Sequence, residues 1–404
     1  YYVIKVRKQS SSNNADFAIF NNGSQAPVSI TSITHSFSGT NLLVDVTLSG
    51  AKSSYEKVWV RYTTNKWTTS NTVEASTDMG SNTWRATIPY TDGTIVEYYA
   101  FTTINLTSAP AESDADFYTI NYINNNGKNY RAGANLSGDY YIGAPGTGPG
   151  GSNPNFFSLR EAVDLINTAT IAGNCTFYFT SNLTETENSF LGVNTSGYTL
   201  TFRPYYDSPT TIKFTKSTDN SSSSGGWIIG LNSDSWTPHV KTDKIVIDGT
   251  APGGTERRLT IQSKNSEGAH NNTAPIVIVG DCDNITIKNV NIVYQPASNT
   301  LTIGAIWVRI STRVNSSGDT PDNLTVENCE ITATGGNTLA GFCLTYTGSS
   351  APTNKAENVL VRNNKITAQT RGIFLNHVGN SDYYNNEIYV NQTASGYLSS
   401  GIHV

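Results

Sequence analysis

The chain has 404 residues, a net charge of −5 and only 14% charged residues, and it is rich in Asn, Ser and Thr. Lys and Arg are sparse and form no basic stripe, and no run reaches the roughly 18 apolar residues of a membrane span. This composition favours β-strands, excludes a nucleic-acid-binding domain and leaves room for two or three domains.

The opening segment repeats a later one. The Tyr pair at 1–2 returns at 98–99, and the Ala-Asp-Phe triplet at 15–17 returns at 115–117. We therefore predict that residues 1–26 are the C-terminal strands of a preceding, truncated copy of the module that follows.

Residues 27–122 have the pattern of a β-sandwich. Short β-favouring runs alternate with turn signals, no cysteine is present, and Trp59 lies on the third run. This pattern predicts an immunoglobulin-like (Ig-like) or fibronectin-III-like sandwich. The predicted strands cover residues 28–34, 42–49, 57–63, 71–75, 82–88, 94–101 and 115–121.

Trp67 lies near a predicted hairpin turn of this sandwich, with Tyr62 close by. Two interpretations are open. The two rings form an exposed platform that stacks on a sugar, or Trp67 packs across its own hairpin.

Residues 123–156 are rich in Gly, Asn and Pro, and we predict a linker that includes one leading strand at 140–142. A helix is predicted to follow, from Phe157 to about Ala169. Ser158 and Glu161 have the spacing of a capping box, and apolar residues then recur at helical intervals. An amphipathic helix here would cover the open edge of a stack of strands.

The last third of the chain repeats the pattern Asn, four residues, Asn, two residues, Ile. Successive copies are 39, 35 and 22 residues apart, a drift that coils of β-strand tolerate through insertions at their turns. We predict that the repeated Asn side chains stack inside the coils, as Asn ladders do in cross-β structures; an exposed array that binds ice or glycan is the alternative. The ladder comprises Asn284, Asn289, Asn323, Asn328, Asn358, Asn363, Asn380 and Asn385.

A second strand register runs between the Asn copies, at 305–308, 341–344, 372–375 and 401–404. Each coil thus has at least two strand positions with inward apolar side chains. The predicted fold class is all-β: an Ig-like or fibronectin-III-like sandwich, then a right-handed parallel β-helix over 157–404 with an N-terminal capping α-helix. Because the pattern stops within a strand, we expect this β-helix to be truncated at its C-terminal end.

Glycosidases and lyases with this fold need converging carboxylates. Asp281 and Asp283 would share one face of an extended strand, with Asp248 one coil earlier and Lys288 or Arg309 as a basic partner. The alternative is that the two Asp residues only turn the chain between strands. A calcium site at this pair lacks the six to eight oxygen ligands that calcium prefers.

The remaining chemistry-bearing residues form no recognisable site. His377 and His403 lack a Ser, Cys or carboxylate partner, so no catalytic triad is predicted. The cysteines have no Cys-x-x-Cys spacing, which predicts buried thiols, neither requiring nor excluding disulfides, and no zinc site. No cofactor or metal is predicted. The four cysteines are Cys175, Cys282, Cys329 and Cys343.

From Gly138 onward the chain resembles the large right-handed β-helix proteins of the Bacteroidota and Ignavibacteria, many of which are type IX secretion cargo. The resemblance lies in the ordered series GDYYIG, FFSLREAVDLIN, YTLTFRPYYDSPTTIKF, KIVIDGTAPGGTERRLTIQS and DNITIKNVNI. More loosely, EKVWVRYTTNKWTTS, VEYYAFTT and DADFYTINY resemble the Ig-like modules of such proteins. The resemblance implies an extracellular or cell-surface protein with a C-terminal sorting domain, and it carries no catalytic assignment.

The leading expectation is a secreted or cell-surface structural and adhesive protein, in which Ig-like spacers carry a stiff β-helix shaft. Its partners would be an extracellular glycan, a surface protein or further copies of itself. The alternatives are a polysaccharide lyase or glycosidase with Ig-like accessory modules, and a non-catalytic carbohydrate-binding array.

Overall fold

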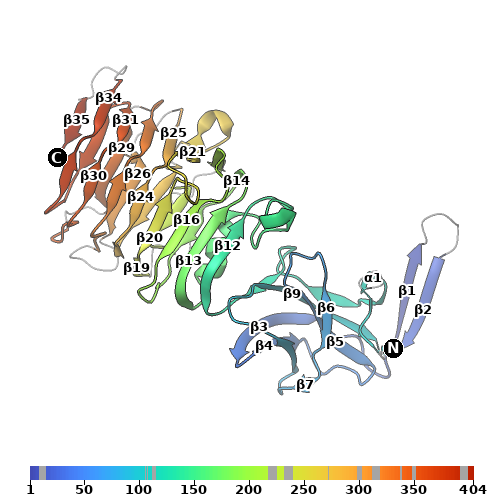
Figure 1. Ribbon diagram of the computed structural model, residues 1–404. Coiled ribbons are helices and arrows are strands. Elements are labelled where there is room, and N and C mark those ends of the chain that lie inside the picture. Colours follow the sequence, from blue (N-terminus) through green and yellow to red (C-terminus); the bar gives the residue numbers. More distant parts are fainter. Residues whose placement is uncertain are drawn as a thin grey trace. The chain divides into compact units, whose positions relative to one another are not determined.

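A computed structural model describes residues 1–8, 15–104, 106, 108–111, 115–216, 225–231, 240–271, 273–297, 303–311, 319–336, 339–347, 352–391 and 399–404. The chain forms two compact units, Tyr1–Ala134 and Asn135–Val404, which are described separately (Figure 1). In both units strands dominate. Among the described residues, no helix combines the length and the apolar character needed to cross a membrane.

The first unit begins with a hairpin of two strands, β1 (Tyr2–Lys8) and β2 (Ala15–Asn21), paired antiparallel with each other alone. One face of the hairpin is apolar and exposed, and it includes Ile4 and Phe17. The assignment of residues 1–26 to a preceding module stays a prediction.

The rest of the first unit is a sandwich of two antiparallel sheets around one apolar core. Val44 and Val46 of one sheet and Val58 and Val60 of the other are fully buried in that core, because alternate residues of each strand point inward. One sheet has the order β3 (Ile30–Ser38), β4 (Asn41–Leu48), β8 (Thr83–Pro89), β7 (Thr77–Asp78). The other has the order β10 (Asn121–Ile123), β9 (Val96–Ile104), β5 (Glu56–Thr63), β6 (Asn71–Glu74), and β11 (Tyr130–Ala132) also pairs with β9.

The predicted strand at 115–121 is wrong over most of its length. Residues Ala115–Tyr118 form the short helix α1, and the strand β10 begins only at Asn121. The same Ala-Asp-Phe triplet is strand in β2, where a hairpin partner satisfies its backbone. Pairing in the fold therefore decides the conformation of this triplet, and not its local sequence.

The second unit consists of three parallel sheets, and the chain visits them in turn (Figure 1). This arrangement is consistent with the predicted parallel β-helix, and we call it the coil stack. Sheet 1 contains β12 (Leu136–Ile142), β13 (Ile171–Phe179), β16 (Leu200–Pro204), β20 (Ile245–Asp248), β24 (Thr286–Lys288), β27 (Thr325–Glu327), β30 (Leu360–Arg362) and β33 (Asp382–Tyr384). Sheet 2 contains β14 (Leu183–Glu185), β17 (Thr210–Phe214), β21 (Leu259–Lys264), β25 (Asn291–Gln295), β28 (Glu330–Ala333), β31 (Lys365–Ala368) and β34 (Glu387–Val390). Sheet 3 contains β15 (Ser189–Leu191), β18 (Trp227–Ile229), β22 (Ile276–Val279), β26 (Ile303–Ser311), β29 (Leu339–Thr347), β32 (Arg371–Leu375) and β35 (Ser400–His403).

Sheet 2 explains the Ile of the repeated pattern. Ile292, Ile331, Ile366 and Ile388 occupy one register position on four neighbouring strands, and the first three are fully buried. Each buried Ile contributes roughly 2 kcal/mol of hydrophobic stabilisation. The pattern therefore marks a strand position of its own, which the sequence analysis did not separate from the Asn positions.

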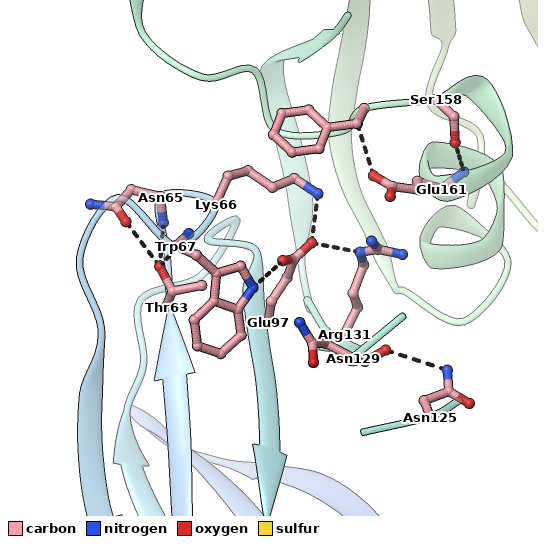
Figure 2. A network of polar contacts seen from close by, with 11 residues as sticks. Thr63, Asn65, Lys66, Trp67, Glu97, Asn125, Asn129, Arg131, Ser158 and Glu161 are labelled. Atoms are coloured by element: carbon pink, nitrogen blue, oxygen red, sulfur yellow. Dashed lines mark hydrogen bonds and ion pairs between the residues drawn. The ribbon is translucent and has the colours of Figure 1, made fainter. Parts of the chain in front are cut away.

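The helix α2 (Leu159–Ile166) has the predicted cap. The Ser158 hydroxyl accepts the N–H of Glu161 at 3.0 Å, and the Glu161 carboxylate accepts the N–H of Phe157 at 2.8 Å (Figure 2). Its buried face contacts β15 and β14, the first strands of sheets 3 and 2. Because β12 already pairs in sheet 1, the coil stack begins before this helix and not after it.

Four short elements complete the coil stack. The strands β19 (Thr242–Asp243) and β23 (Cys282–Asp283) pair in parallel, just ahead of β20 and β24. Two single-turn 3₁₀ helices, η2 (Pro149–Gly151) and η3 (Asn265–Glu267), lie in loops.

Candidate functional site

A buried carboxylate organises one side of the sandwich. Glu97 in β9 is 5% exposed and accepts from Lys66 at 2.5 Å, from Arg131 at 2.9 Å and from the indole N–H of Trp67 at 2.9 Å. Figure 2 shows the three donors converging on it. Breaking such a buried pair is costly because it leaves a charge without compensation, so this cluster fixes the position of the Trp67 ring.

The two rings of the predicted sugar platform, Trp67 and Tyr62, both pack against other residues of the first unit. Trp67 is half-buried, with its ring 5.5 Å from the ring of Tyr99 and inclined at 36° to it. Tyr62 is half-buried against the sandwich core, and burial raises the pKa of its hydroxyl. Trp67 therefore packs within its own module, but against Tyr99 and Glu97 of β9 and not across its own hairpin, as the second interpretation expected.

Asp281 and Asp283 do lie together, at the edge of the coil stack, and they share a cation. Lys241 Nζ is 3.2 Å from Asp283 Oδ2 and 3.7 Å from Asp281 Oδ1. Its bond to Asp283 raises the pKa of Lys241, while partial burial, with repulsion from Asp283 and Asp319, raises the pKa of Asp281. Lys241 was missed from the sequence, although it lies one coil before the Asp pair, at matching register.

Asp248 does not join this pair. It lies at the end of β20, where it is in register with Lys288, whereas Asp283 is in register with Asp243. Five residues of chain, including the left-handed turn residue Lys244 or Asn284, separate the two register positions, so Asp248 and Asp283 belong to different strands of their coils.

The surroundings of Asp248 are those of a fixed, ionised side chain. It accepts from Asn289 Nδ2 at 3.1 Å and from Thr250, and Lys288 Nζ is 3.5 Å away. Burial works to raise its pKa, but these bonds and the Lys288 charge together hold the pKa below its usual value. The proposed basic partner Lys288 thus serves Asp248, while Arg309 lies 4.3 Å from the ring centre of Trp307 in sheet 3.

Carboxylates also form a column along this edge. Each of four successive coils has one carboxylate directly before the turn that leads into its sheet 1 strand. These residues are Asp243, Asp283, Asp322 and Glu357. Each of the last three accepts a backbone N–H from the next coil: Asp283 from Asp322 at 3.1 Å, Asp322 from Glu357 at 2.8 Å, and Glu357 from Asn380 at 2.6 Å. We call these four residues the acidic column. The oxygens of the last three bind the fold's own backbone, which agrees with the turn-forming alternative for Asp283.

The predicted interior Asn ladder is wrong in its location. Seven of the eight ladder residues are exposed and Asn289 is half-buried. All except Asn380 have φ between 53° and 57°, the left-handed conformation that Asn tolerates better than most residues. The ladder thus consists of turn residues: one set precedes each sheet 1 strand, and the other makes the corner between sheets 1 and 2. The corner set is Asn289, Asn328, Asn363 and Asn385.

The corner leaves little space. In the coil before Asn289, Gly249 holds the matching position, where an added Cβ would lie 1.6 Å from the carbonyl oxygen of Asn289. Glycine is required there because the neighbouring coil approaches so closely. Within the described part of the chain, one hydrogen bond joins the side chains of two ladder residues, from Asn358 Nδ2 to Asn323 Oδ1 at 3.0 Å.

An interior Asn pair does exist, one residue further along. Asn364, 2% exposed, donates to Asn386 Oδ1 at 3.0 Å and to the carbonyl oxygen of Val326 at 3.0 Å. Asn386 in turn donates to the carbonyl oxygen of Val361 at 2.8 Å. The doublets Asn363-Asn364 and Asn385-Asn386 were the available sequence signal.

The histidines and cysteines of the described residues are engaged elsewhere in the fold. His377 is bonded to the carbonyl oxygen of Pro352 at 2.7 Å, and His403 packs 5.3 Å from the ring of Phe374. All four cysteines are free and buried. Within the described ranges, no group of three or more His, Cys, Asp or Glu side chains is arranged to hold a metal ion.

The comparisons with known proteins add no family. No protein-family model matches the chain, and neither a curated protein nor a solved structure matches it.

Proposed function

We propose that the chain is part of a secreted or surface-displayed structural and adhesive protein. In this proposal the sandwich is an Ig-like or fibronectin-III-like spacer module, and the coil stack is a right-handed parallel β-helix that serves as a stiff shaft. The resemblance to exported β-helix proteins of the Bacteroidota and Ignavibacteria is part of the proposal and supplies its extracellular setting.

The observation that carries the proposal is the unbroken register of the coil stack. Sheet 1 runs through eight strands and sheets 2 and 3 through seven each among the described residues. At about 4.8 Å per coil, sheet 1 spans roughly 34 Å of continuous parallel ladder. Such a structure resists bending because every inner coil is hydrogen-bonded to both neighbours.

The residues at the edge of the coil stack support the same proposal. The acidic column accepts backbone N–H groups, and Asp248 is engaged by Asn289, Thr250 and Lys288. These carboxylates hold the chain in place, whereas a hydrolytic site needs two that face an open substrate path.

The deciding experiment is a depolymerisation screen of the full chain against a panel of plant, algal and bacterial polysaccharides. It follows new reducing ends and unsaturated products, with Asp281→Asn/Asp283→Asn as the matched variant. We expect no turnover by either protein. Turnover that disappears in the double variant would make the Asp pair catalytic, and turnover that persists would place a catalytic site elsewhere; either result overturns the proposal.

The setting is tested separately, with antibodies raised against the chain and applied to intact cells of the source organism. We expect labelling without permeabilisation, or recovery of the protein from the medium. Labelling that appears only after permeabilisation would contradict surface display.

A further inference from the structure

We propose that the first unit contains a binding site for a short neutral saccharide, in a pocket beside the strand β9. Tyr99, Thr119, Tyr122, Asn124 and Asn129 line this cavity of about 330 Å³, which we call the tyrosine pocket. This volume is at the lower end of the roughly 300–1,000 Å³ of small-molecule sites, which suits one or two sugar rings.

Strand pairing brings the lining residues to one face of the sheet. Tyr122 in β10 is opposite Phe101 in β9, so Asn124, two residues on, follows the same face towards Tyr99. The chain then loops out over residues 124–129 before β11 rejoins β9 at Tyr130. The pocket therefore lies where this loop leaves the edge of β9.

The Tyr99 ring is held firmly. Its centre is 5.5 Å from the ring centre of Trp67 and 5.8 Å from that of Phe101, and both contacts are tilted. Trp67 is itself held by its bond to Glu97, which Lys66 and Arg131 neutralise. A ring fixed in advance loses little conformational entropy when a ligand stacks on it.

The other lining groups suit hydroxyl recognition. Tyr122 is 65% exposed and presents a second ring, so aromatic and amide groups occur together. The Asn129 side-chain amide makes no hydrogen bond within the described part of the chain, and Asn124 uses only Oδ1, which accepts from Gly127 at 3.1 Å. Amides of this kind both donate and accept, as sugar hydroxyls require, while the apolar face of a pyranose packs on an aromatic ring.

Charge selects the class of sugar. All five lining residues are uncharged. Of the cations near them, Lys66 and Arg131 are committed to Glu97, and Lys5 donates to the carbonyl oxygen of Thr119. A charged sugar would lose its hydration without gaining an ion pair from the lining residues. The site is therefore assigned to neutral pyranosides.

This saccharide site rests on the proposed function, because it would supply the ligand for the proposed adhesive role. The two can fail separately: the depolymerisation screen concerns the coil stack, whereas the present test concerns the first unit. A chain without turnover and without sugar binding would keep its structural role and lose this site.

The test uses the full chain with maltose, cellobiose, lactose and digalacturonate as probes, read by saturation-transfer NMR and calorimetric titration. We expect at least one neutral disaccharide to bind. Tyr122→Ala should weaken it by about two- to twelvefold, since an aromatic contact contributes about 0.5–1.5 kcal/mol beyond the area that it buries. Tyr122→Phe should retain most of the affinity.

Tyr55→Ala is the matched control, because Tyr55 is another exposed Tyr of the same unit, 44% exposed and outside the pocket. It should bind like the parent protein, and Asn129→Ala should bind more weakly. No binding of any neutral probe, binding of digalacturonate alone, or binding that Tyr122→Ala and Asn129→Ala leave unchanged would each overturn the assignment.

Discussion

The Glu185 carboxylate accepts the backbone N–H of Leu159, the first residue of α2, at 2.7 Å, from a strand that comes 26 residues later. It also accepts the N–H of Arg160 at 3.3 Å, and Glu185 is only 3% exposed. Helix N-termini leave backbone N–H groups without partners and favour negative charge. One side chain of the first sheet 2 strand thus joins the helix to the coil stack.

Glu185→Ala should destabilise the coil stack by about 2 kcal/mol, because it removes a buried acceptor from two N–H groups. Chemical denaturation followed by circular dichroism would measure this loss. Glu187→Ala is the control, since the Glu187 side chain is 59% exposed, and a surface change of this kind stays within about 0.5 kcal/mol. Equal effects of the two variants would contradict the role of Glu185.

The corner Asn residues yield a test of backbone conformation. Asn363 has φ 57° and an exposed side chain, so Asn363→Ala should cost about 1 kcal/mol, while Asn363→Gly should be nearly neutral. Asn380, exposed and outside the left-handed set, should tolerate Ala. Urea denaturation midpoints would rank the three variants. If Asn363→Gly lowered stability as much as Asn363→Ala, the Asn side chain itself would contribute to stability, as the predicted interior stacking of Asn side chains requires.

The acidic column predicts a dependence on pH. Burial, with repulsion from Asp283 and Glu357, raises the pKa of Asp322. The folded chain therefore holds this proton more tightly than the unfolded chain, and stability is lost as pH rises through the raised pKa. Asp322→Asn keeps an oxygen for the Glu357 N–H, so it should gain stability over the parent protein at neutral pH, with the gain vanishing in acid.

Asp207→Asn is the control of opposite sign. Its bond with Arg258 lowers the pKa of Asp207, so the parent protein gains from this pair above the usual Asp range and loses the gain as pH falls. This variant should be the less stable one at neutral pH and equal to the parent in acid. The free energy of unfolding of each variant, minus that of the parent protein, would be measured from acid to neutral pH. As pH rises, this difference should become positive for Asp322→Asn and negative for Asp207→Asn. Differences that do not change with pH would contradict both predictions.

The four cysteines should be unreactive in the folded protein. Burial raises the pKa of Cys175 to about 11 and that of Cys329 to about 12, and it raises the pKa of Cys282 and Cys343 as well. Because the thiolate is the reactive form, a colorimetric thiol reagent should modify none of them before denaturation and all four afterwards. Fewer than four after denaturation without reductant would reveal a disulfide.

Strands with long, regular patterns were predictable. The apolar runs of sheets 1 and 3 and the Ser158 cap of α2 appear where the sequence places them. The later strands of sheet 2 were missed because strands such as β31 (Lys365–Ala368) have four residues and a period of two that offers only two inward positions, too few to stand out.

The candidate site was less predictable. Repetition identified the Asn positions, but it could not distinguish a stacked side chain from a left-handed turn, since Asn suits both. Lys241 and Asp283 meet only because β19 pairs with β23. Lys66 and Arg131 likewise contact Glu97 although they are 31 and 34 positions away from it in the sequence. Local sequence patterns cannot predict contacts of this kind.

The corner between sheets 1 and 2 has a practical consequence. The two Asn positions of every copy are five residues apart, while successive copies are 39, 35 and 22 residues apart. One bend is thus of fixed length, and the remainder of each turn varies. A foreign peptide inserted into a variable segment would leave the strands of neighbouring coils in register. Peptides inserted into successive coils would therefore be displayed in a row, at a spacing of about 4.8 Å.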